Sequence, residues 1–159
     1  MTKEKGPEAS ALARNRRARF DYHILETWEA GLELTGGEVK SCRAGSASLA
    51  EAFAAFDNKG RELFLRDMRV QPYLPAGRIG FEERDPARPK RLLMHRAELR
   101  KRYAQVREKG LAIVPLKLYA ARGRIKVELA LVQGKEKGDK RQALKEKTAK
   151  KELSRLRNR

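Results

Sequence analysis

Cysteine, histidine and long apolar runs are all scarce in this 159-residue chain. The single cysteine, Cys42, excludes an internal disulfide and a cysteine-rich zinc site, so we expect an ordinary reduced thiol. The two histidines have no third residue at metal-ligand spacing, and we predict no metal or other cofactor. No apolar run approaches the roughly 18 residues that span a membrane. The first ten residues, MTKEKGPEAS, lack the apolar core of a signal peptide, which favours a cytoplasmic protein without membrane attachment.

Motifs for catalysis are also absent from the sequence. No glycine-rich phosphate loop precedes a helical pattern, and no GxSxG nucleophile motif occurs. Cys42 has no histidine near it in the sequence, so a cysteine nucleophile has no neighbouring base. We therefore predict a binding protein that is not an enzyme and has no catalytic residues.

Acidic residues are far outnumbered, because 38 lysines and arginines face 21 aspartates and glutamates, giving a formal net charge of +17. Such an excess favours a polyanionic partner, most often nucleic acid and less often an anionic membrane surface. The excess is concentrated at both ends of the chain, whereas every aromatic residue lies between positions 20 and 133. We therefore predict a basic N-terminal extension at 1–14, a folded domain at 15–133 and a basic tail at 134–159.

The middle of the chain has the patterns of a mainly β protein with a few helices. Apolar and polar residues alternate from Phe20 to Leu34, which is typical of a half-buried strand, with a bend expected at Gly31. Residues 52–70 and 111–132 predict two hairpins, which turn at 57–60 and around 122–123. Between the hairpins, residues 95–110 have a helical stripe that ends at a glycine. Many short strands with few helices favour a small closed barrel.

The stretch WEAGLELTGGEVKSCRAG (28–45) places three glutamates in a strongly basic protein. Thr35 and Glu38 have the spacing of a capping box, which predicts a helix of about two turns that stops at Gly45. Glu38 therefore has two interpretations, a cap at a helix start or a carboxylate that accepts hydrogen bonds from RNA bases. Arg88, Lys90 and Arg91 also have two interpretations, a phosphate-binding patch or an ordinary solvated loop.

Six segments of the chain match the sequence pattern of one known family, in the order in which that family has them. The segments are NRRARFDY (15–22), EAGLELTGGEVKSCRAG (29–45), RPKRLLMH (88–95), KGLAIVPLKLY (109–119), KVELALVQGK (126–135) and DKR (139–141). They resemble the small protein B family, the SsrA-binding proteins of bacterial trans-translation. The chain departs from the family's usual residues at Phe20, Gly37 and Gly138, and the last of these usually is an aromatic residue or histidine.

The resemblance implies an oligonucleotide-binding (OB)-like closed barrel that binds the tRNA-like domain of transfer-messenger RNA (tmRNA). Such a protein delivers the RNA to stalled ribosomes for trans-translation, and its partners would be tmRNA and the decoding region of the small ribosomal subunit. Through the same RNA it would meet elongation factor Tu and alanyl-tRNA synthetase, and we expect a monomer. The candidate RNA-binding residues are Asn15, Arg16, Arg17, Glu29, Glu38, Lys40, Ser41, Arg43, Lys126 and Lys135.

The basic tail has too few large apolar residues to fold alone, yet residues 141–156 contain good helix formers without glycine or proline. This composition predicts a tail that is intrinsically disordered when free, and the resemblance implies that it becomes helical on the ribosome, where it would sense the empty message channel. The candidate ribosome-binding residues are Asp139, Lys140, Arg141, Lys145 and Lys147. Two alternatives remain: a solvated tail that binds RNA without specificity, and a ribosomal or ribosome-assembly barrel that binds ribosomal RNA.

Overall fold

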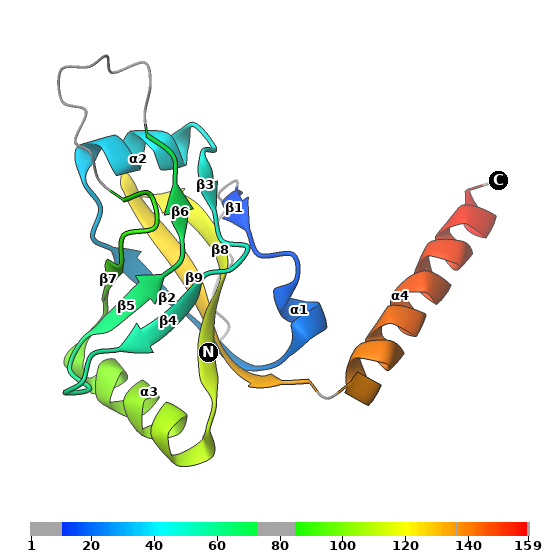
Figure 1. The fold of residues 1–159 in the computed structure, drawn as a ribbon. Helices are drawn as coiled ribbons and strands as arrows, with labels where there is room; N and C mark the ends of the chain where they lie inside the picture. Colours follow the sequence, from blue (N-terminus) through cyan, green and yellow to red (C-terminus); the bar gives the residue numbers. More distant parts are fainter. Residues whose placement is uncertain (1–10, 73–84, 136, 159) are drawn as a thin grey trace.

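The computed structural model describes residues 11–72, 85–135 and 137–158, and these form a strand-rich body followed by a long helix (Figure 1). The elements in chain order are β1 (Ala11–Arg14), α1 (Ala18–Asp21), β2 (Tyr22–Leu32), α2 (Gly36–Arg43), β3 (Ala47–Ser48), β4 (Phe53–Phe56), β5 (Leu63–Arg66), β6 (Arg69–Val70), β7 (Lys90–Leu93), α3 (Arg96–Lys109), β8 (Ala112–Ala121), β9 (Arg124–Gly134) and α4 (Lys137–Arg157).

Six strands close into a ring in the order β8-β4-β5-β7-β2-β9, because β9 pairs with both β2 and β8. The pairs in this ring are antiparallel, and β1 joins it by pairing with β8. In Figure 1, α2 lies across one end of the ring and α3 lies at the other end. The predicted closed barrel with few helices is confirmed. The sheet begins at Ala11, four residues before the boundary predicted at 15, because β1 hydrogen-bonds along β8.

The core fills the ring with the residues that alternate inward along its long strands. Ile125, Val127, Leu129 and Leu131 of β9 are all buried, as their period-two pattern predicts. Along β2 the inward series includes Trp28, Ala30 and Leu32. The strand itself begins at Tyr22, two residues later than predicted, because Phe20 belongs to the short helix α1. The register between β2 and β9 shifts between Ile24 and Glu26, not at Gly31 where we expected a bend.

A second, smaller apolar cluster lies on the outer face of the barrel at one end of β9. Ala130 and Val132 point to the face opposite the core, yet both are fully buried against Ala18 of α1 and Val114 of β8. Helix α1 therefore covers this end of the outer face. Nearer the other end of the same strand, the outward residues Lys126 and Glu128 are only partly buried, so the uncovered surface is charged.

Both predicted hairpins and the predicted helix between them are confirmed. The first hairpin pairs β4 with β5 and turns at 57–60, and the second pairs β8 with β9 through Arg122 and Gly123, which both have positive φ. Helix α3 ends at Gly110 in the left-handed conformation, with φ of 61°. His95 occupies the N-cap position of α3, but its side chain makes no capping hydrogen bond.

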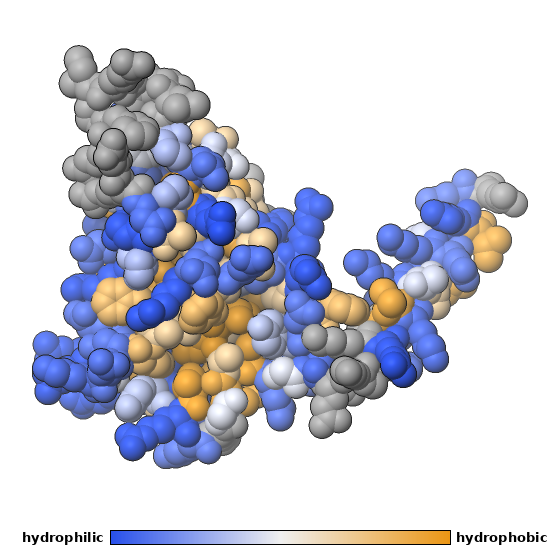
Figure 2. Space-filling model, viewed as in Figure 1, coloured by the Kyte–Doolittle hydropathy of each residue, from blue (hydrophilic) through white to orange (hydrophobic). Residues whose placement is uncertain are grey.

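The tail forms the single helix α4, which starts beside α1 and extends away from the barrel (Figure 1). Its described side chains from Arg141 onward are exposed, including Leu144, Leu153 and Leu156. Figure 2 shows hydrophilic residues along much of this helix. The helical form agrees with the predicted propensity of the segment. The expected disorder of the free tail stays a prediction. Its physical ground is that the exposed helix has no apolar core of its own.

Candidate nucleic-acid interface

The carboxylate of Glu29 is held on the outer face of the barrel by residues from two neighbouring strands. Lys126 Nζ of β9 lies 2.7 Å from Glu29 Oε1, and the Tyr119 hydroxyl of β8 donates a hydrogen bond to Glu29 Oε2. Partial burial, together with the hydrogen bond to Glu29, raises the pKa of Tyr119, so this hydroxyl remains a donor. About half of the Glu29 side chain stays exposed, so the carboxylate can still accept a hydrogen bond from a ligand.

The strand register extends this cluster into a row of charges across four strands. Glu29 is opposite Glu128 of β9, Glu128 is opposite Lys117 of β8, and Lys117 is opposite Arg14 of β1. The Lys117 Nζ and Glu128 Oε2 atoms lie 3.7 Å apart. We call Arg14, Glu29, Lys117, Tyr119, Lys126 and Glu128 the outer-face patch. Its carboxylates can accept hydrogen bonds from base N–H groups, while its cations can contact phosphates.

Helix α2 carries a second group of candidate residues, and Glu38 caps its start. The Glu38 N–H donates to Thr35 Oγ1 at 3.3 Å, and the Thr35 N–H donates to Glu38 Oε1 at 3.0 Å, so the capping box is confirmed. Arg88 donates a further hydrogen bond to Oε1. Burial disfavours the ionised carboxylate, but the hydrogen bonds from Arg88 and Thr35 outweigh it and lower the pKa of Glu38. Glu38 is thus an ionised, partnered residue with 13% of its side chain exposed.

Lys90 is fully buried beneath α2, which contradicts both a phosphate patch and a solvated loop at this position. Its Nζ donates to the carbonyl oxygens of Met68 at 3.0 Å and Arg88 at 2.8 Å, and lies 3.8 Å from Glu38 Oε2. Burial lowers the pKa of Lys90, and the neighbouring Glu38 carboxylate limits the fall. Lys90 and Glu38 therefore hold together α2, β6 and the start of β7.

The other candidates on α2 divide between the interior and the surface. Ser41 is 1% exposed and packs inward, so its side chain does not reach the surface in this conformation, and its expected role in RNA binding stays a prediction. Cys42 is fully buried, and burial raises the pKa of its thiol to about 11, as expected for an unreactive reduced cysteine. Lys40 and Arg43 are exposed, and Arg43 Nη2 donates to the Gly123 carbonyl at 3.2 Å. The helix thus presents two basic residues to solvent.

A third group surrounds α1, at the other end of the outer face. Asn15 is fixed on β8, because its Nδ2 donates to the Pro115 carbonyl at 3.0 Å and its N–H donates to the Leu116 carbonyl at 2.8 Å. Lys135 Nζ donates to the Arg19 carbonyl at 3.0 Å. The candidates Arg16 and Arg17 are exposed between β1 and α1, so this group also offers cations to an anionic partner.

The candidate residues of the tail lie along α4. Arg141, Lys145 and Lys147 are exposed on this helix. Asp139 and Lys140 lie in its first turn, and their side chains are outside the described part of the structure. The structure therefore separates the candidates into the outer-face patch, the α2 surface, the α1 surface and the tail.

Two residues that shape these surfaces, Tyr119 and Arg102, were missed by the sequence reasoning, and so was the burial of Lys90. Tyr119 orients Glu29, and its outward position follows from the alternation along KLYAA, so the strand pattern contained a signal for it. Arg102 is 5% exposed, lies 3.8 Å from the centre of the Trp28 ring and pairs with Glu26 at 3.0 Å. Neither its burial nor that of Lys90 could be read from patterns in which a basic residue is assumed to face solvent.

Neither a cluster of metal ligands nor a membrane-spanning helix occurs in the described residues. Residues 11–72, 85–135 and 137–158 contain no group of three or more histidine, cysteine, aspartate or glutamate side chains that could hold a metal ion. Within the same ranges, no helix has both the length and the apolar character needed to cross a bilayer.

The closed ring of strands, with its charged outer face, α2 and α1 surfaces and long basic helix, defines an OB-like barrel protein of a nucleic-acid-binding class. Residues 12–159 match the family described as SmpB protein, and the chain belongs to this family. It is 47% identical to the SsrA-binding protein of Desulforamulus reducens, over 97% of this chain and 92% of the relative. It is 49% identical to the SsrA-binding protein of Moorella thermoacetica, over 94% of each chain.

A solved structure gives a matching fold. One chain of the structure described as "tmRNA-SmpB: a journey to the center of the bacterial ribosome" superposes with a TM-score of 0.62 and is 44% identical in sequence. The match covers 82% of this chain and 92% of that chain. Both the family and the mainly β fold expected from the sequence are therefore confirmed.

Proposed function

We propose that this protein binds the tRNA-like domain of tmRNA and delivers it to stalled ribosomes for trans-translation. Its relatives are named for binding SsrA, and its structural neighbour is SmpB in a work on tmRNA and the bacterial ribosome. The family match covers the barrel and the tail together, so both parts belong to the proposed function. The rival role, a barrel that binds ribosomal RNA as a structural component, is not suggested by these relatives.

The observation that carries this proposal is the oriented Glu29 carboxylate among cations on the outer face. Lys126 and Tyr119 fix Glu29 from two adjacent strands, so the position of the carboxylate is set before any RNA binds. A preoriented acceptor reads base N–H donors at a lower entropic cost than a mobile side chain does. In this proposal Glu29 reads a base, while Lys126, Lys40 and Arg43 neutralise phosphates and set the salt dependence of binding.

The tail has the separate role of sensing the empty message channel at the decoding region. Helix α4 is basic and exposed along its described length, which suits a channel walled by RNA phosphates. Asp139, Lys140, Arg141, Lys145 and Lys147 are its proposed ribosome contacts. Elongation factor Tu and alanyl-tRNA synthetase would be reached through the same RNA. The protein acts in this scheme as a cytoplasmic, monomeric binding factor without a catalytic step of its own.

Two measurements on the full-length protein and a variant ending at Lys135 test this function. We expect the full-length protein to bind the tRNA-like RNA more tightly than a ribosomal RNA fragment of equal length at the same salt concentration. The variant should keep most of this affinity, because α4 extends away from the barrel and charges are largely screened beyond about 8–10 Å at physiological salt. It should lose peptide tagging on ribosomes stalled on a truncated message. Equal affinity for the two RNAs, or tagging at the full rate by the variant, would contradict the proposal.

A further inference from the structure

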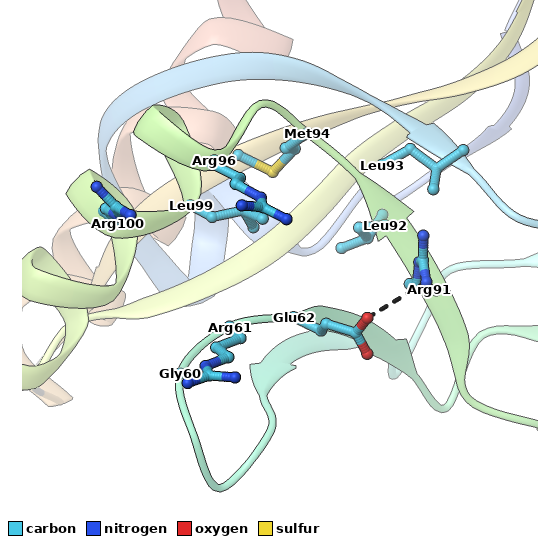
Figure 3. A pocket seen from close by; sticks show the side chains of 10 residues that line it. All are labelled: Gly60, Arg61, Glu62, Arg91, Leu92, Leu93, Met94, Arg96, Leu99 and Arg100. Atoms are coloured by element: carbon cyan, nitrogen blue, oxygen red, sulfur yellow. Dashed lines mark hydrogen bonds and ion pairs between the residues drawn. The ribbon is translucent and has the colours of Figure 1, made fainter.

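A cleft with a volume of 740 Å³ lies between the start of α3, the end of β7 and the turn that joins β4 to β5 (Figure 3). Leu92, Leu99 and Met94 contribute apolar surface to it. The charged lining residues are four arginines and one glutamate, namely Arg61, Arg91, Arg96, Arg100 and Glu62. We call this site the arginine cleft. It lies outside the outer-face patch, and of the basic residues that the sequence offered as phosphate contacts it contains Arg91 alone.

The two sides of the arginine cleft are fixed against each other. Gly60 of the β4–β5 turn has a φ of 66°, and a Cβ atom at this position would lie 2.5 Å from Tyr103 Cζ of α3. Only glycine therefore allows the turn to approach the helix so closely. The Phe56 and Tyr103 rings make an edge-to-face contact at 5.2 Å, which joins β4 to the same helix. Arg61 on the turn and the arginines of α3 consequently face one preformed space.

Most of the positive charge in the cleft is not neutralised by the described residues. Arg91 pairs with Glu33 at 3.3 Å and with Glu62 at 3.2 Å. For the guanidinium groups of Arg61, Arg96 and Arg100, no carboxylate of residues 11–72, 85–135 or 141–158 is recorded within ion-pair distance.

The charges on α3 are also unfavourable to one another in the free protein. Arg96 and Arg100 are exposed and four residues apart, a spacing at which like charges destabilise a helix slightly. Arg102 of the same helix is different, because it is buried, paired with Glu26 and stacked on Trp28. Helix α3 therefore uses Arg102 for its own packing, whereas Arg96 and Arg100 gain partners only from an anionic ligand.

We propose that the arginine cleft is a second phosphate-binding site for the RNA, in which Arg61, Arg96 and Arg100 hold backbone phosphates. This inference rests on the proposed function, because it takes the RNA to be the ligand of the outer face. Guanidinium groups suit phosphate oxygens, which they can bind through two parallel hydrogen bonds. The apolar floor reduces access of water to these contacts, which strengthens the attraction between the charges.

The position of the cleft favours RNA over an acidic protein segment. Leu93 at the edge of the cleft is paired with Gly31 of β2, and Gly31 is paired with Lys126 of β9. The cleft is thus two strand spacings, about 10 Å, from the Lys126 end of the outer-face patch. Gly31 adds no side chain of its own to this interval, and the half-exposed Leu93 side chain packs beside it, so an RNA backbone that crosses here would pass over Leu93. One RNA backbone that contacts Lys126 can therefore continue into the arginine cleft.

The test compares charge removal inside and outside the cleft in the full-length protein. The cleft variant is Arg96→Gln combined with Arg100→Gln. The control is Arg107→Gln, which is exposed on almost the same side of α3 but lies about 10 Å further along the helix from Arg100. A third variant, Lys126→Gln, reports on the outer-face patch. The binding of the tRNA-like RNA is measured from about 50 to 200 mM salt, the range in which phosphate contacts change affinity strongly.

We expect the cleft variant to lower the slope of log affinity against log salt by about two, one for each arginine removed. Wild-type affinity should then fall about tenfold more than that of the cleft variant across this salt range. The Arg107→Gln control should keep the wild-type slope. Arg100→Lys should also keep it, because the charge remains.

Three outcomes would overturn the inference. If the cleft variant keeps the wild-type slope and affinity while Lys126→Gln loses both, the arginine cleft does not bind RNA, although the proposed function stands. If the cleft variant instead loses binding of an oligoglutamate peptide with unchanged RNA affinity, the cleft binds acidic protein segments. If the wild-type protein shows no preference for the tRNA-like RNA, the proposed function fails and this inference fails with it.

Discussion

Replacing the buried Lys90 with methionine should destabilise the protein strongly, although the side chains have similar size. Lys90 Nζ donates hydrogen bonds to the Met68 and Arg88 carbonyls and lies beside Glu38, with no part of the side chain exposed. Lys90→Met removes these donors and leaves the Glu38 carboxylate without its buried neighbour. Removing one partner of a buried ion pair destabilises by about 3–5 kcal/mol, a figure that already includes the unsatisfied partners. That loss is a large share of the roughly 5–15 kcal/mol by which a typical domain is stable.

The neighbouring residue provides a matched control for this prediction. Arg91→Met also removes one positive charge from β7, but the Arg91 ion pairs involve side chains that are about half exposed. Exposed pairs contribute about 0–1 kcal/mol, so the control should lose little stability. Urea unfolding followed by circular dichroism gives both free energies, with a similar dependence on urea expected for the two proteins. If Lys90→Met unfolds at the same urea concentration as Arg91→Met, the buried cluster does not stabilise the fold as argued.

Three further changes test the candidate surfaces and the helix cap. Glu29→Gln should weaken binding of the tRNA-like RNA by about 1–3 kcal/mol in a filter-binding assay. It should change the free energy of unfolding by less than about 1 kcal/mol, because the Glu29 ion pair is exposed. An affinity equal to that of the wild type would exclude base reading by this residue. Lys126→Gln should lower the salt slope by about one, and an unchanged slope would mean that Lys126 does not contact phosphate. The lowered pKa of Glu38 gives stability that is complete above about pH 4.5 and is lost as pH falls through the native-state pKa. Glu38→Gln should remove the Glu38 contribution to the acid dependence of urea unfolding and leave that of Glu26 and Asp57, whose pKa values are also lowered. The exposed control Glu33→Gln should keep the Glu38 contribution.

The fold could be predicted from the sequence wherever a local pattern has one interpretation. Alternation along β9 identifies which residues enter the core, because a one-residue shift would expose all of them. The Thr35 and Glu38 spacing gives the start of α2, because the capping box is formed within four residues. In these two cases the contacts that determine the structure form between residues close together in the sequence, so a local pattern is enough to predict them. The burial of Ala130 and Val132 follows instead from α1, which docks from a distant part of the chain.

The candidate site was harder to predict, because partners across strands decide what each charged residue does. Ser41 was assigned to the RNA surface from its position in the family motif, but the phase of α2 turns it into the interior. Lys90 belongs to a basic run that resembles a phosphate patch. Side chains alternate between the two faces of β7, however, and Lys90 is on the inward face. The arginine cleft joins a turn, a strand end and a helix start, and no local pattern places these three segments together.

The three glutamates of residues 28–45 have a common physical role in this basic protein. Each lies beside a cation from a distant segment: Glu29 beside Lys126, Glu33 beside Arg91, and Glu38 beside Arg88. An ion pair of this kind gives a long basic side chain a defined position, which a surface composed of mobile lysines and arginines would lack. Cations with a carboxylate partner have a fixed geometry, whereas those without one, such as Arg96 and Arg100, retain their full attraction for phosphate. We therefore expect the acids to orient paired cations such as Lys126 for their phosphate contacts, and the unpaired Arg96 and Arg100 to add further contacts of their own.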